Sequence, residues 1–402
     1  MDGATLARVT DISRPLVGRE HFTASLPPGA LHFTAHGHHP RLDVTRHATL
    51  ECWDDSARLQ GGKWGKFFRE VVPEAQGHIA GILGLAAPER IAFAGSTHEF
   101  VARLLTCFDP GRPIRVLTSD CEFASFDRQL RRAMERGTVD ATIVPVLPGA
   151  DFEERFAAAA EAASFDLVFL SEVMFNRGYL VKGLAALCRR LKATGAEVVI
   201  DGYHAFMALP EDFAGAGDDC FYMAGAAKYA MAGEGACFMS LPRGCDLRPE
   251  DTGWFADFPN RGAVGDGPVV YPDDGWRFAG SVLDPAGLYR FNAAMRLLDG
   301  LGVTVDDIHD HVRALQALFL RAVADIGHPV AAPGNLTVDD PARRGNFIAF
   351  EHQDAAAFAD RLAAEGGKAD ARGRIIRFGF GCYHSGGDVA RLVDILHDLA
   401  RN

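Results

Sequence analysis

The sequence predicts an α/β fold with a large domain, built on a mostly parallel sheet, and a smaller C-terminal α/β domain. Short apolar runs recur from about residue 90 onward, separated by amphipathic stretches of helical length. This alternation favours parallel strands covered by helices on both faces, because each crossover returns through a helix. A length of 402 residues also exceeds one typical core, which favours two domains.

The expected elements follow in chain order. After an amphipathic helix at 67–85, strands are expected at 90–94, 114–118, 141–146, 167–170, 197–200 and 220–223, with a helix at 98–108. A long irregular connection is expected at 258–276. Beyond it we expect helices at 285–301, 304–326, 354–365 and 387–399, with strands at 346–350 and 375–378.

These elements divide the chain into three parts. We expect residues 1–45 to form an N-terminal segment that packs on the small domain, and residues 46–290 to form the large domain. Residues 291–402 form the expected small domain.

Composition restricts the classes of partner. With 48% hydrophobic and 23% charged residues the chain is typical of a globular protein, and its net charge of −12 argues against nucleic acid or an anionic membrane as the main partner. The eight cysteines contain no CxxC pair, which favours reduced thiols. No basic n-region and no membrane-length apolar run is visible, so we expect a cytoplasmic protein without a membrane partner.

The most informative pattern joins an acid and a lysine. Asp201 follows an apolar run and is expected at a strand end, and Lys228 follows the next apolar run among small residues. A carboxylate facing a pyridinium nitrogen and a lysine that forms an imine are the two groups that pyridoxal 5′-phosphate (PLP) requires. His204, three residues after Asp201, is placed to bond that carboxylate or a ring oxygen. The plainer interpretation is that Asp201 is an acid in a turn and that His204 is a histidine whose hydrogen bonds are satisfied within the protein.

Three further positions fit the same hypothesis. Ser96 and Thr97 open a predicted helix directly after a strand, an arrangement that binds phosphate, although an ordinary N-cap has the same signature. Phe123 is placed to stack on a planar ring, or else packs in the core. Arg377, at a strand end in the C-terminal part, suits a bidentate hold on a substrate carboxylate, or else a structural ion pair.

Taken together, these residues resemble the class V aminotransferase family of fold-type I PLP enzymes, and within it the kynureninases, from about residue 66 to 385. The matching motifs, in chain order, are Asp201-Gly202-Tyr203-His204-Ala205, Lys228-Tyr229, Gly253-Trp254-Phe255, Arg277-Phe278-Ala279-Gly280-Ser281 with Leu288-Tyr289, and Arg377-Phe378-Gly379-Phe380 followed by Tyr383.

The resemblance implies a role for each matched residue. Ser96 and Thr97 would bind phosphate, Phe123 would stack on the ring, Asp201 would pair with its nitrogen, Lys228 would form the internal aldimine and Arg377 would hold the substrate α-carboxylate. It also implies a homodimer with shared active sites, to which Trp254 and Ser281 contribute across the interface. The substrate would be a small-molecule α-amino acid.

Several positions depart from the kynureninase pattern. Ala227 replaces the tyrosine expected before the lysine, the acid expected after Phe123 comes one residue late at Asp127, and Met174 stands where an asparagine is expected. The N-terminal Gly-Asn-Ser-Leu-Gly segment is replaced by a His-rich turn. This turn and Arg177 suggest a different, more anionic substrate than kynurenine.

The reaction therefore stays open among transamination, kynureninase-type Cβ–Cγ hydrolysis, and β-elimination or desulfuration. A desulfurase would need a mobile cysteine, for which Cys382 is the candidate in the C-terminal part. Two other classes are a metal-dependent hydrolase using His36, His38 and His39, and a non-catalytic relative that keeps the fold. Lys228 argues against the latter.

Overall fold

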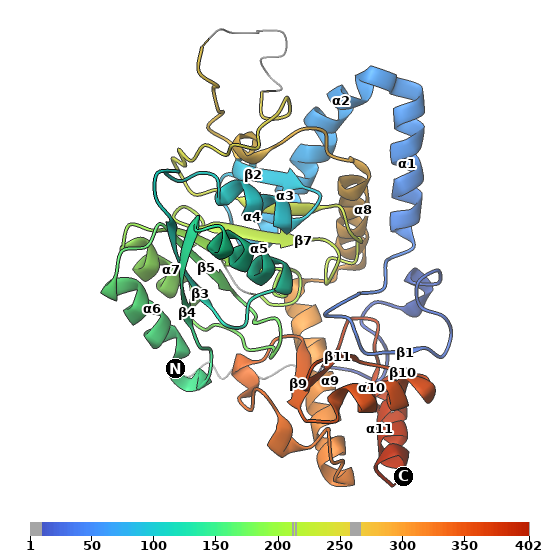
Figure 1. Cartoon of the computed structure of the whole chain (residues 1–402). Helices are drawn as coiled ribbons and strands as arrows, with labels where there is room; N and C mark the ends of the chain where they lie inside the picture. The colour runs from blue at the N-terminus through green and yellow to red at the C-terminus, as the bar shows by residue number, and fades with distance from the viewer. Residues whose placement is uncertain (1–9, 211–212, 214, 258–266, 402) are drawn as a thin grey trace, which may run out of the picture.

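The computed structural model describes residues 10–210, 213, 215–257 and 267–401, and its strands form three sheets (Figure 1). The largest sheet has seven strands in the order β2-β8-β7-β6-β5-β3-β4. Their bounds are β2 Ile91–Ala94, β3 Ile114–Ser119, β4 Val139–Val144, β5 Leu167–Ser171, β6 Glu197–Asp201, β7 Phe221–Gly225 and β8 Cys237–Ser240. All neighbours pair in parallel except β8, which is antiparallel to both β7 and β2. The predicted α/β fold with a mostly parallel sheet is confirmed.

Helices cover both faces of this sheet, as Figure 1 shows. Helices of the large sheet are α1 Val44–Leu59, α2 Lys63–Lys66, α3 Val72–Leu83, α4 Thr97–Leu104, α5 Ala124–Glu135, α6 Phe152–Ala162, α7 Leu184–Lys192 and α8 Ala286–Leu301. Apolar side chains of α4 and α5 share one core with Val199 and Phe221, whereas α3, α6, α7 and α8 share another with Val198 and Ile200. Consecutive strand residues therefore enter opposite cores, and this explains why the strands are apolar throughout.

The C-terminal part has its own sheet and core. Strands β11 Asp370–Arg372, β12 Ile375–Gly379 and β9 Phe347–Glu351 pair antiparallel in that order. Helices α9 Val305–Ile326, α10 Ala355–Ala364 and α11 Gly386–Arg401 accompany this sheet, and α9 begins with a capping box between Thr304 and Asp307. Phe319, Phe350 and Phe378 lie in a separate buried cluster here. The two-domain α/β architecture predicted from the sequence matches this arrangement.

The N-terminal segment lies against the C-terminal part, with the blue strand β1 beside the red strand β10 in Figure 1. Strand β1 Leu31–His32 pairs in parallel with β10 Gly367–Lys368, and the Val17 amide donates to the Cys382 carbonyl at 3.0 Å. Helix α1 packs instead on α8, where the Tyr289 hydroxyl donates to Asp55 at 3.0 Å. The segment boundaries near residues 45 and 290 stay a prediction.

Several features differ from the sequence-based expectations. Strands β1, β8, β10 and β11 were not expected. For β1, β10 and β11 the reason is length, because a pattern of two or three residues has no measurable period. Strand β4 begins and ends two residues earlier than expected. In the connection expected at 258–276, residues 258–266 lie outside the described part, and a 3₁₀ helix occupies Gly275–Phe278. None of the described helices is both long and apolar enough to cross a membrane.

Candidate active site

A cavity of about 420 Å³ opens where the carboxyl ends of the central strands meet the C-terminal sheet. Seven of the residues predicted for the site line it: Ser96, Thr97, Phe123, Asp201, His204, Lys228 and Arg377. They come from β6, from turns after β2, β3 and β7, and from β12. The fold thus brings together side chains that are up to 281 positions apart, Ser96 and Arg377 being the extremes.

Lys228 and His204 are in direct contact. The Lys228 Nζ lies 2.5 Å from His204 Nε2 and 4.9 Å from the centre of the Tyr203 ring. Burial lowers the pKa of Lys228 to about 7; Asp201 opposes this shift and Arg377 adds to it. Burial and the nearby Lys228 also lower the pKa of His204. These pKa shifts favour the uncharged forms of both side chains, and an uncharged amine is the form that attacks a carbonyl carbon.

Asp201 ends β6 and is buried at the floor of the cavity. Its Oδ1 accepts the Tyr203 backbone N–H at 2.9 Å. Burial raises the pKa of Asp201, whereas the Tyr203 amide and Lys228 oppose the rise. A carboxylate that is buried, and that has capacity left for another donor, favours a protonated heteroaromatic nitrogen beside it.

The N-terminus of α4 forms another wall of the cavity. Ser96 precedes this helix, but its side chain makes no capping hydrogen bond and donates to Glu99 Oε1 at 3.2 Å. Ser96 is therefore the N-cap residue of α4 by position, but its hydroxyl does not cap the amides of the first turn. The uncapped amides of the first turn and the helix dipole favour an anion such as a phosphate.

Phe123 immediately precedes α5 and is 37% exposed, so the interpretation that it packs in the core is wrong. Its ring meets the Phe175 ring edge-on, with centroids 5.2 Å apart, and lies 6.0 Å from the Lys228 Nζ. An exposed aromatic face in a cavity is suited to stack on a planar ring.

Arg377 reaches the cavity from β12, but its guanidinium is already paired. Its Nε donates to Asp370 Oδ2 at 3.0 Å, another of its nitrogens contacts the same oxygen, and Nη1 donates to the Phe175 carbonyl at 2.7 Å. The side chain is 1% exposed. The ion-pair interpretation of this arginine therefore applies, whereas its hold on a substrate carboxylate stays a prediction.

The His-rich turn separates its members. His36 is buried, lines the cavity and stacks on the Phe347 ring with centroids 4.6 Å apart. His38 is exposed at the cavity edge, whereas the His39 Nδ1 bonds the Pro40 carbonyl at 2.9 Å. Within the described ranges, no group of three or more His, Cys, Asp or Glu side chains is placed to hold a metal ion.

Trp254 and Ser281 do not line the cavity of this chain. Trp254 packs on Trp64, with ring centroids 5.7 Å apart, and Ser281 is exposed. Of the positions that depart from the kynureninase pattern, Ala227 lines the cavity, whereas Met174 is buried outside it. The roles of Trp254 and Ser281 in a partner's site stay predictions.

Three residues that shape the site were not predicted from the sequence. Tyr203 lies beside Lys228, Asp370 pairs with Arg377, and the buried carboxylate of Glu122 bonds to Ser171 on the cavity wall. Tyr203 was quoted only as part of a motif, and Asp370 lies on an unexpected strand. Glu122 directly precedes Phe123, and its position at a strand end was an available signal.

These residues fit PLP. The cavity volume lies within the range of about 300–1,000 Å³ that small ligands occupy. Lys228 offers an amine, Asp201 a buried carboxylate for the ring nitrogen, Phe123 an aromatic face, and α4 an uncapped helix N-terminus for the phosphate.

Comparisons with known proteins agree with this geometry. Residues 308–396 match the family model of the kynureninase C-terminal domain. The chain is 28% identical over 205 residues to isopenicillin N epimerase from Streptomyces clavuligerus, covering 50% of each protein. It is 24% identical over 303 residues to a cysteine desulfurase from Pectobacterium atrosepticum, covering 70% of this chain and 68% of that one. The chain thus spans half the length of the epimerase and about two-thirds of the desulfurase.

Among solved structures, the chain resembles the cystine C–S lyase C-DES, in a form with glycine covalently linked to its PLP cofactor. The TM-score is 0.80 at 16% identity, over 95% of this chain and 99% of the lyase. The fold is therefore that of the PLP-dependent α/β enzymes. Within them it is the class V aminotransferase-like fold, as the family model and the curated relatives also indicate.

Proposed function

We propose that this protein is a PLP-dependent enzyme that acts on an α-amino acid. The observation that supports this best is the contact of Lys228 with His204 in the cavity that Asp201 also lines. When bound, PLP supplies an aldehyde that condenses with amines and a ring that withdraws electrons from the substrate. The fold and the comparisons with PLP-dependent relatives support the same proposal.

The residues of the cavity have separate roles. Lys228, with its lowered pKa, holds the cofactor and moves a proton at its Nζ, while His204 accepts or returns that proton. Asp201 keeps the ring nitrogen protonated, and the first turn of α4 holds the phosphate. Arg377 orients the substrate carboxylate. Which substrate bond breaks would follow from the orientation that these residues give the substrate.

Desulfuration through the Cys382 thiol is the least supported reaction. Cys382 is 1% exposed, contacts Met231 Sδ at 3.5 Å and does not line the cavity. Burial also raises the pKa of this thiol to about 12. A buried, protonated thiol is a poor nucleophile.

Kynureninase-type Cβ–Cγ hydrolysis is the second candidate, because the kynureninase C-terminal model covers the segment that contains Arg377.

A homodimer with shared active sites is part of the proposal. Trp254 and Ser281 lie outside the cavity of their own chain, which fits a contribution to a partner's cavity. On α1, Leu50 and Trp53 are 54% and 69% exposed, and large exposed apolar side chains favour an interface. Sedimentation equilibrium of the full chain tests this: a monomer at micromolar concentration would contradict it.

The function is tested by visible spectra of the purified, PLP-loaded protein with a panel of cystine, cysteine, alanine, glutamate and kynurenine. We expect a visible band that shifts with at least one amino acid, and product analysis for sulfide, oxo acid or anthranilate then identifies the reaction. Lys228→Ala should lose both band and turnover, whereas Lys192→Ala, which removes a lysine paired with Glu197 on the outside of α7, should keep them. A wild-type protein that stays colourless with added PLP would contradict the proposal.

A further inference from the structure

Glu122 is a buried acid that the proposed chemistry does not use. It follows β3 and is 6% exposed, and its carboxylate receives donors from two segments. The Ser119 hydroxyl donates to Oε1 at 2.6 Å, the Ser171 backbone N–H donates to Oε2 at 3.0 Å, and the Ser171 hydroxyl contacts the same oxygen. Burial raises the pKa of Glu122 to about 7, although both serines oppose the rise.

Ser171 connects this acid to the active site. It ends β5 directly beside Asp201 in the parallel ladder, and its side chain lines the same cavity as Asp201 and Lys228. A serine hydroxyl has one proton and two acceptor lone pairs, so the group that takes its proton decides what it offers elsewhere. While Ser171 donates to Glu122, its oxygen presents only lone pairs to the cavity.

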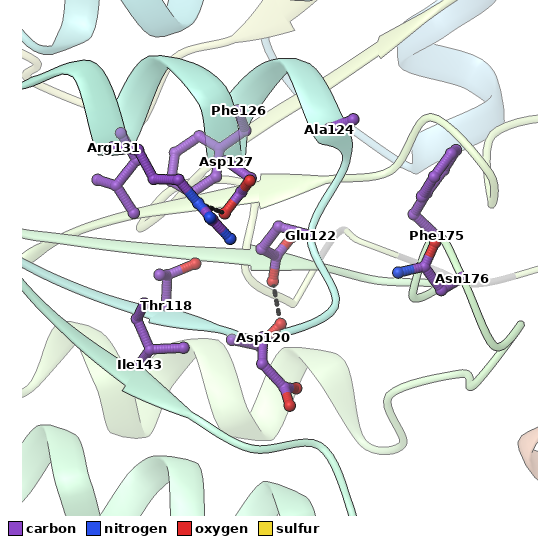
Figure 2. A pocket seen from close by; sticks show the side chains of 12 residues that line it. Thr118, Asp120, Glu122, Ala124, Phe126, Asp127, Arg131, Ile143, Phe175 and Asn176 are labelled. Carbon is purple, nitrogen blue, oxygen red and sulfur yellow. Dashed lines mark hydrogen bonds and ion pairs between the residues drawn. The ribbon is translucent and has the colours of Figure 1, made fainter. Parts of the chain in front are cut away.

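On its other side Glu122 borders a second cavity of about 260 Å³ (Figure 2). Ser119, Asp120, Asp127, Arg131 and Asn176 also line it, and Figure 2 shows Glu122 among them with Asp127 and Arg131 paired to one side. Within the described residues, the buried Thr118 Oγ1 on this wall has no hydrogen-bond partner. A cavity of this size with several polar side chains in its wall accommodates several waters, since each occupies about 30 Å³.

We infer that Glu122 is a positioning residue that exchanges a proton with the second cavity. Through its hydrogen bond to Ser171, Glu122 sets whether the Ser171 hydroxyl presents its proton or its lone pairs to the group beside Asp201. One proton passes from a hydronium ion in the second cavity to Glu122 Oε2, where it forms an O–H bond and leaves a neutral water molecule. That O–H donates to Ser171 Oγ, and the Ser171 hydroxyl rotates so that its own proton points into the active-site cavity. The inference rests on the proposed function, because the group beside Asp201 is the cofactor ring.

Several charges act on Glu122 from the surrounding elements. Asp201 on β6 raises its pKa. Asp120 lies two residues before it in the chain, Asp127 and Arg131 on α5 line the second cavity, and Lys228 acts on Asp201 from the other cavity. The positive charge of Arg177 acts on the neighbouring Cys121 and belongs to the same electrostatic surroundings. A variant that changes Glu122 alone is therefore needed to isolate its contribution.

The test compares the PLP-loaded wild type with Glu122→Gln, which cannot ionise, and with Asp127→Asn, which removes a carboxylate from the same cavity without touching Ser171. The visible band is titrated from about pH 5 to 9. We expect the wild type and Asp127→Asn to share one spectral midpoint, and Glu122→Gln to lose it or move it by at least about one unit. A midpoint unchanged in Glu122→Gln would contradict the inference. If that variant does not fold, Ser171→Ala replaces it with the same expectation.

A second measurement is independent of the cofactor. Glu122 retains a proton in the folded protein between pH 4.5 and about 7, whereas the unfolded chain has lost it. The free energy of unfolding of cofactor-free wild type should therefore fall over this range relative to Glu122→Gln. Identical pH profiles would contradict the inference. A protein that forms no visible band would overturn the proposed function, and the unfolding profiles alone would then decide whether Glu122 exchanges a proton.

Discussion

Asp370 on β11 lies directly across the ladder from Arg377 on β12 and accepts a hydrogen bond from its Nε at 3.0 Å. Burial raises the pKa of Asp370, but His36 and Arg377 outweigh that effect and hold it below its ordinary value. The guanidinium available for a substrate carboxylate is thus already partly neutralised by a carboxylate of the protein. Substrate binding at Arg377 must compete with Asp370.

This competition predicts opposite effects of two substitutions. Arg377→Ala should raise KM about 10- to 100-fold, since hydrogen bonds to charged groups contribute ~1.5–3 kcal/mol. Asp370→Asn should lower KM, by up to about tenfold, because it removes the competing charge. Steady-state kinetics with the amino acid identified by the spectral panel measures both. The control is Arg374→Ala. This arginine is exposed in the turn between β11 and β12 and does not line the cavity. An unchanged KM in both variants would move the carboxylate site elsewhere.

The lowered pKa of Lys228 predicts a pH-dependent stability. Between about 7 and its ordinary value of 10.5, the unfolded chain binds a proton that the folded, cofactor-free protein does not. The free energy of unfolding should therefore rise with pH across this window in the wild type relative to Lys228→Met. Denaturant titrations at several pH values measure this difference. A difference that stays constant with pH would show that Lys228 keeps its ordinary pKa.

Phe123 provides a test of ring stacking. Phe123→Ala should weaken PLP binding about 5- to 10-fold, because an aromatic stacking contact contributes ~1–1.5 kcal/mol. Equilibrium binding of PLP measures the loss, and thermal unfolding of the cofactor-free variant should change little, since this side chain is partly exposed. Unaltered PLP affinity would assign the ring contact to another side chain.

Gly225 fixes the position of Tyr203. A Cβ at this position would lie 2.5 Å from the Tyr203 hydroxyl and 2.6 Å from Cys237 Sγ. Gly225→Ala should therefore cost ~1–3 kcal/mol of stability and displace Tyr203 from Lys228. Gly81→Ala is the matched control, because a Cβ in that part of α3 meets no atom within 4 Å. It should leave stability unchanged or raise it by less than about 1 kcal/mol. Equal unfolding midpoints for the two variants would contradict the steric argument.

The sequence predicted the elements with a clear period and the residues at strand ends. Asp201 and Lys228 follow long apolar runs, so their arrival at one edge of the sheet followed from parallel strand order. The partner of Arg377 could not be predicted, because Asp370 belongs to a three-residue strand whose pairing register only tertiary contacts define. The position of Glu122 between two cavities likewise depends on how β3 and β5 meet. The local pattern of the sequence does not contain these tertiary contacts.

The most direct test is to reduce the PLP-loaded protein with borohydride and locate the modified residue by peptide mass spectrometry. We expect a phosphopyridoxyl group on Lys228 in the wild type, and no modification of that peptide in Lys228→Arg. Modification of another lysine, or of none in a protein saturated with PLP, would contradict the assignment of this cavity as the active site.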